Sequence, residues 1–223
     1  MISIDLKTDG RFYELEEMVR AKCQDCIGCC DCCTGMGDSM ILDPYDVQVL
    51  KKELGKTMEQ LLQQGLLSLG MDRGLVLPHI QMDPVSDRCP FLSGEGRCSI
   101  HAYRPGMCRL FPLGRNFEDG KLTYILLTEE CKKRNRSKIK VSQWLGVTPA
   151  KTYHEFVLAW HEFRKKLTAL LADMEEERIK EVLMFVLKAF YFDEELHAED
   201  IFANLFWKIK DMEKRLGMCD NTD

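Results

Sequence analysis

Apolar residues recur at helical spacing through the last third of the chain. Three stripes run over residues 156–171, 179–190 and 201–216, with apolar side chains three or four positions apart. Asp173 and the segment FDEELHAED separate them. The pattern predicts three amphipathic helices, which bury their stripes by packing together or onto the rest of the chain.

The preceding half shows shorter and more varied elements. DPYDVQVLKKELG predicts a helix with Asp43 as its cap and Gly55 beyond its end, and Thr57 is expected to cap a second short helix. LVLPHIQM and CPFLSGEGRCSIH indicate short extended pieces, and GRNFEDGKLTYILL predicts a hairpin that turns at Asp119-Gly120. We therefore expect an α+β fold that is mostly α, with a loop-rich half followed by a three-helix region.

The cysteines divide the chain in the same way. Ten of the eleven lie between residues 23 and 131, and none lies between 132 and 218. We predict a cysteine-cluster metal-binding region over residues 1–140, a helical region over 141–218 that packs on it, and a polar tail over 219–223.

A basic segment, CKKRNRSKIK, joins the two halves and holds six Lys and Arg in the nine residues after Cys131. We interpret it as a solvated connector, because no aromatic stacking platform accompanies it. Two alternatives are a nucleic-acid patch and a group of cations that offsets the negative charge of a thiolate site.

Charge and hydropathy narrow the class of protein. A net charge of −5 disfavours general affinity for nucleic acid or anionic membranes, because the summed field repels polyanions. No apolar run approaches the roughly 20 residues that span a bilayer, and the first twenty residues lack the hydrophobic stretch of a signal peptide. We expect a cytoplasmic protein without a nucleic-acid or membrane partner. Cytosolic thiols stay reduced, so the eleven cysteines indicate metal binding rather than disulfides.

The stretch CQDCIGCCDCC places six cysteines in residues 23–33. CxxCxxC is the three-ligand run of ferredoxin-like cluster loops, and here it occurs twice in overlapping registers that are offset by three residues. Ten thiolates exceed one four-ligand site, and eight would fill two. The candidate metal ligands are Cys23, Cys26, Cys29, Cys30, Cys32, Cys33, Cys89, Cys98, Cys108 and Cys131.

Ligand type alone does not select the metal, because thiolates bind both zinc and iron. A remote cysteine followed by proline, as in Cys89-Pro90, is typical of [4Fe–4S] sites, and ten thiolates exceed the needs of a structural zinc. We therefore favour an iron–sulfur cluster, with zinc as the alternative. His101 is a further potential ligand, although a packed or surface position fits it better.

The order of CxxCxxCC, a segment like ILDPYDVQVLKKELG, and CPFLSGEGRCSIHAYRPGMCRLFP resembles the YkgJ-like cysteine-cluster family, which is described as zinc- or iron-chelating domains. The resemblance covers roughly residues 23 to 131. Two registers fit the family pattern, and the distance to the helix start at Asp43 favours the second, which leaves Cys23 and Cys30 as extras. The first register comprises Cys23, Cys26, Cys29 and Cys30, and the second comprises Cys26, Cys29, Cys32 and Cys33.

The same cysteine arrangement is similar to the N-terminal part of flagellin lysine N-methylases. That resemblance implies an alternative function, an iron–sulfur enzyme that uses S-adenosylmethionine to modify a protein substrate. Residues 132–223 contain no Gly-rich loop followed by an acidic residue of the kind that binds such cofactors, and no catalytic group is assigned. A metal-handling chaperone is a further alternative.

Overall fold

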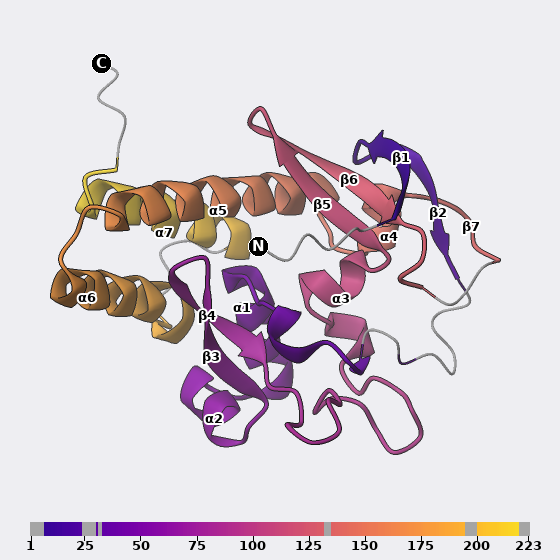
Figure 1. The fold of residues 1–223 in the computed structure, drawn as a ribbon, viewed down its shortest axis with the longest axis horizontal. Helices are drawn as coiled ribbons and strands as arrows, with labels where there is room; N and C mark the ends of the chain where they lie inside the picture. The colour runs from indigo at the N-terminus through magenta and orange to yellow at the C-terminus, as the bar shows by residue number, and fades with distance from the viewer. Residues whose placement is uncertain (1–6, 24–29, 31–32, 132–134, 195–199, 219–223) are drawn as a thin grey trace. The chain divides into compact units, whose positions relative to one another are not determined.

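The computed structural model describes residues 7–23, 30, 33–131, 135–194 and 200–218 (Figure 1). Its contacts group the chain into two compact units, each built from two separate segments. Unit 1 comprises residues 1–37 and 82–154, and unit 2 comprises residues 38–81 and 155–223. The fold is α+β and mostly α, as predicted. The predicted division into a metal-binding region over residues 1–140, a helical region over 141–218 that packs on it and a polar tail over 219–223 stays a prediction.

Unit 1 is built around a three-stranded antiparallel sheet in the order β1-β6-β5. The β5–β6 hairpin turns at Asp119-Gly120, and both residues have the positive φ (50° and 70°) that a type I′ turn requires, which confirms the predicted hairpin. The strands are β1 (Thr8–Tyr13), β5 (Leu113–Glu118) and β6 (Lys121–Leu127).

A second, two-stranded ribbon in unit 1 pairs β2 (Met18–Lys22) with β7 (Ser137–Lys140). The last four residues of the basic connector therefore form a strand, in which Ile139 lies opposite the buried Val19. Short helices complete the unit: η3 (His101–Tyr103), α3 (Gly106–Leu110) and α4 (Val141–Leu145).

The first segment of unit 2 carries the two helices expected from the cap residues. The Asp43 side chain accepts a hydrogen bond from the Asp46 N–H at 2.9 Å and begins α1 (Pro44–Leu54). Thr57 caps α2 (Met58–Gln63) in the same way. Both capping predictions are confirmed. A hairpin of β3 (Leu67–Asp72) and β4 (Leu75–Ile80) follows, and β4 confirms the extended piece predicted for LVLPHIQM. A short turn, η2 (Gly37–Ser39), precedes this segment.

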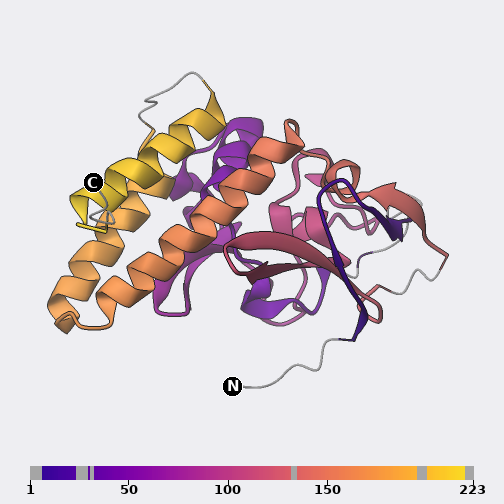
Figure 2. The ribbon, with the colours of Figure 1, turned by 90° about the horizontal axis from the view of Figure 1, so that it is seen from above.

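The three helices predicted from the apolar stripes are present. They are α5 (Ala150–Leu171), α6 (Glu176–Leu187) with the π-helical turn η4 (Lys188–Phe192), and α7 (Ile201–Arg215). In unit 2, α5 and α7 lie side by side and run in the same direction (Figure 2), with Lys166 paired to Glu213 at 3.0 Å. None of the described helices has both the length and the apolar character needed to cross a bilayer.

Aromatic rings fill the core of unit 2. Trp160 stacks on Phe163 with ring centroids 5.3 Å apart, and Phe190 of η4 lies 4.8 Å from Trp160. The Tyr191 hydroxyl donates a hydrogen bond to the Leu42 carbonyl at 3.2 Å, which ties η4 to the start of α1. The core therefore joins both segments of this unit.

Gly70 in β3 makes room for a buried histidine ring. A Cβ at Gly70 would lie 3.0 Å from His79 Nε2, while His79 is 3% exposed and its Nδ1 lies 2.6 Å from the Asp38 carbonyl. The imidazole ring cannot move away from an added Cβ without losing the contact between its Nδ1 and the Asp38 carbonyl. We expect Gly70→Ala to lower the free energy of unfolding by about 1–2 kcal/mol, measured by urea denaturation.

The matched control is Gly94→Ala, where an added Cβ meets no atom within 4 Å. It should leave stability unchanged or raise it slightly, because alanine reduces the entropy of the unfolded chain. Equal stability of the two variants would contradict the steric role of Gly70.

Candidate metal centre

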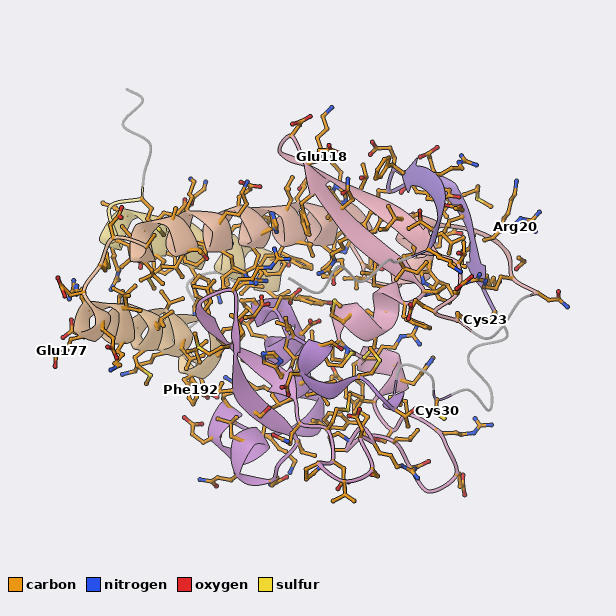
Figure 3. The ribbon with its side chains drawn as sticks, viewed as in Figure 1. Arg20, Cys23, Cys30, Glu118, Glu177 and Phe192 are labelled. Atoms are coloured by element: carbon orange, nitrogen blue, oxygen red, sulfur yellow. The ribbon has the colours of Figure 1, made fainter. Side chains whose placement is uncertain are left out.

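Seven of the ten candidate cysteines lie in the described residues, and all seven belong to unit 1. Cys26, Cys29 and Cys32 lie outside the described residues. Cys23 directly follows β2, and Cys30 is the next residue along the chain that the structure describes (both labelled in Figure 3). No disulfide joins any of the seven to another described residue.

Backbone pairing brings the N-terminal cysteine segment against the segment that leads into CPFL. The Cys89 N–H donates to the Cys33 carbonyl at 2.8 Å, and Thr34 pairs with Arg88 in an antiparallel bridge. Cys33 is 6% exposed and Cys89 is 8% exposed. Two cysteines that lie far apart in the sequence therefore become buried neighbours.

A tight loop returns the chain from Cys89 to Cys98. Leu92 donates its N–H to the Cys89 carbonyl at 3.0 Å and forms a single antiparallel bridge with Cys98. Gly96, with a φ of 72°, turns the loop, and Phe91 within it is buried. The extended pieces expected in CPFLSGEGRCSIH are thus reduced to isolated bridges around a turn, because the glycines reverse the chain before a strand can form.

The Cys33 and Cys98 side chains meet. The pKa of the Cys98 thiol is lowered to about 6, chiefly by a hydrogen bond from Cys33 and further by the backbone at Ile100 and the Arg104 guanidinium, against the opposing effect of burial. Cys98 is therefore a thiolate at neutral pH, and the thiolate is the form that binds metal. This pair is the clearest donor group in the described residues.

Arg104 was not singled out from the sequence as a functional residue. Its guanidinium contacts Nε2 of the exposed His101, and the His101 N–H donates to the Cys98 carbonyl at 3.3 Å. A cation six residues after a candidate ligand, within a short turn, is the sequence signal that could have identified it. A positive charge at this position offsets part of the charge of the thiolates.

The remaining described cysteines occupy separate elements. Cys108 lies in α3, and Cys131, which is 8% exposed, follows the end of β6. Within the described ranges, no three Cys, His, Asp or Glu side chains are placed so as to hold a metal ion together. The structure thus brings Cys33, Cys89 and Cys98 into one region.

A comparison with protein families fits these observations. The family model described as "CxxCxxCC: Putative zinc- or iron-chelating domain" matches residues 22–136, which is just over half of the 223-residue chain and contains all ten candidate cysteines. No curated protein and no solved structure matches the chain. The cysteine-bearing half is thus a metal-binding domain, and the chain belongs to the CxxCxxCC family of zinc- or iron-chelating domains.

Proposed function

We propose that the chain is a cytoplasmic protein that binds an iron–sulfur cluster of the [4Fe–4S] type through its cysteines. The observation that supports this proposal most directly is the contact between the Cys33 and Cys98 thiols, with the Cys89 backbone paired to that of Cys33. Three cysteines from two distant segments thus lie in one region. The ten cysteines of the domain exceed the four that a structural zinc requires, which favours a cluster.

The donor chemistry of this region fits the proposed group. Cys33 and Cys98 would be ligands, with Cys89 beside them and with Cys26, Cys29 and Cys32 from the CxxCxxC run. Cys108 and Cys131 are available to a second centre, whereas Cys23 and Cys30 would be extras. An iron–sulfur cluster supplies one-electron redox chemistry when bound.

The residues around these thiols favour the binding of a metal. Burial of Cys33 and Cys89 excludes water from their sulfurs, and Arg104 stabilises the negative charge of the Cys98 thiolate. The tight loop that ends at Cys98 holds the thiolate beside Cys33. The loop therefore orients the donors before any metal arrives.

Anaerobic purification tests the identity of the metal. We expect stoichiometric iron and acid-labile sulfide, with visible charge-transfer absorption that bleaches in air, because oxygen oxidises clusters of this type. Metal analysis, sulfide assay and absorption spectra on the same sample provide the measurement. A colourless protein that holds stoichiometric zinc would overturn the proposal in favour of the zinc alternative.

The roles predicted from the sequence for this centre are a protein-modifying enzyme that uses S-adenosylmethionine and a metal-handling chaperone. Both stay predictions, because the contacts described for the cysteines bear on ligation and not on a substrate. The same holds for the predicted protein substrate and for the absence of a nucleic-acid partner.

A further inference from the structure

The β2–β7 ribbon of unit 1 presents one apolar face and one cationic face. On β2, Met18, Arg20 and Lys22 are exposed, while the alternate residues Val19 and Ala21 are buried. The β2–β7 register shifts between Val19 and Lys22, so that Lys22 lies opposite Ser137. The alternating burial along β2 nevertheless places all three exposed residues on the solvent side of the strand.

The cations of β7 join the same face. Lys140 lies opposite Met18 in the antiparallel register, and residues directly opposite each other share a face. The exposed Lys138 lies two positions before Lys140 on the strand, so its side chain points to the same side as that of Lys140. We call Arg20, Lys22, Lys138 and Lys140 the basic ribbon.

Most of this charge is not neutralised. Lys140 pairs with Glu16 at 3.0 Å, but Arg20, Lys22 and Lys138 form no ion pair with any residue that the structure describes. Same-face neighbours on a strand stand about 7 Å apart, and like charges this close on a sheet repel each other. This repulsion lowers the stability of the fold, and no described acidic residue offsets it at these three positions. The uncompensated charge therefore indicates that a partner molecule supplies the opposite charge.

The charge of the chain is also distributed unevenly. Unit 1 contains 17 Lys and Arg against 14 Asp and Glu, whereas unit 2 contains 14 against 22. The basic ribbon therefore belongs to the net positive part of an acidic chain. It also adjoins the metal-binding segment, because Cys23 directly follows Lys22 (Figure 3).

We propose that the basic ribbon docks an acidic protein partner beside the cysteine cluster. Charge complementarity supplies the attraction, and Met18, which is 47% exposed on the same face, supplies an apolar contact of the kind enriched with arginine in protein interfaces. β2 and β7 contain no aromatic side chain, so the ribbon lacks the platform on which nucleic-acid bases stack. A protein surface is therefore favoured over a nucleic acid.

Fluorescence anisotropy on metal-loaded full-length protein tests this docking surface. The probes are a labelled peptide of alternating glutamate and leucine and a labelled oligothymidylate. We expect the peptide to bind, with affinity that falls as ionic strength rises, and the triple variant Arg20→Glu, Lys22→Glu, Lys138→Glu to weaken binding at least about tenfold. The oligothymidylate should bind more weakly than the peptide.

A matched control distinguishes an effect of this surface from an effect of the net charge of the chain. The triple variant Lys121→Glu, Lys210→Glu, Lys214→Glu changes three exposed lysines elsewhere, and both triples shift the formal net charge from −5 to −11 because each substitution removes one positive charge and adds one negative charge. We expect the control to retain most of the binding. A milder set, Arg20→Gln, Lys22→Gln, Lys138→Gln, should also weaken binding and serves if the glutamate variant does not fold.

Three outcomes would overturn the proposal. Equal weakening by both triples would show a general charge effect, and absence of peptide binding would show that the lysines only protect exposed strand edges from pairing. Tighter, ribbon-dependent binding of oligothymidylate would identify a nucleic-acid surface instead. Metal content, measured on every variant, shows separately whether the centre is intact, so the result does not depend on the metal proposed above.

Discussion

Replacing Cys98 with serine is expected to remove most of the metal from the purified chain. Cys98 meets Cys33 through its side chain and has a thiol pKa of about 6, so it offers a thiolate at neutral pH. A serine hydroxyl stays protonated and is a poor ligand for zinc or iron. The loss should exceed the roughly 10- to 100-fold drop in affinity that follows when a residue hydrogen-bonded to a metal ligand is removed. Metal-to-protein ratios and competition with a chromogenic chelator provide the measurement.

The matched controls are Cys23→Ser and Cys30→Ser, which make the same chemical change at the positions that the second register leaves out. We expect both to keep the metal content of the unmodified chain, and Cys33→Ser to match Cys98→Ser. Retention of metal by Cys98→Ser would show that the assigned ligand region is wrong. Loss of metal in Cys23→Ser as well would favour either the first register or a second centre.

Local sequence rules predicted the elements that local chemistry determines. Asp43 and Thr57 cap their helices because each side chain accepts a hydrogen bond from an N–H three residues later. Asp119-Gly120 makes its hairpin because both residues tolerate positive φ. The three helices near the C-terminus follow from stripes that only a helical period aligns. In each case, the signal lies within a few residues of its effect.

Pairing between distant segments could not be predicted in this way. The strand at residues 137–140 is four residues long and basic, and its pairing with β2 depends on a partner more than a hundred residues away. Likewise, nothing near residues 38–81 shows that this segment joins the C-terminal helices, since that grouping depends on rings such as Tyr191 reaching Leu42. Long-range contacts of this kind leave no periodic pattern.

The cysteines illustrate the same limit at the site. Spacing identified ten candidate ligands but could not say which sulfurs meet. Cys33 and Cys98 meet because the Thr34–Arg88 bridge and the loop after Cys89 bring the two segments together. The first of these steps depends on backbone pairing between segments that are remote in the sequence. The family pattern therefore identifies the kind of site, and the fold places the donors.

Replacing Phe156 with alanine is expected to lower the free energy of unfolding of unit 2 by about 3–5 kcal/mol. Phe156 is fully buried, and its ring lies 6.1 Å from the Phe202 ring and 6.3 Å from the Phe206 ring, so truncation removes contacts between α5 and α7 and leaves a cavity. Urea denaturation followed by circular dichroism measures the shift in the helical transition.

Met184→Ala is the control for Phe156→Ala, because Met184 lies on α6 with 62% of its side chain exposed and should change stability by less than about 0.5 kcal/mol. Equal effects of the two substitutions would contradict the central place of Phe156 in the core. Phe156 lies in unit 2 and the candidate ligands lie in unit 1, so the folded variant should keep its metal. Retained metal with a lowered helical transition would show that metal binding does not depend on the packing of Phe156.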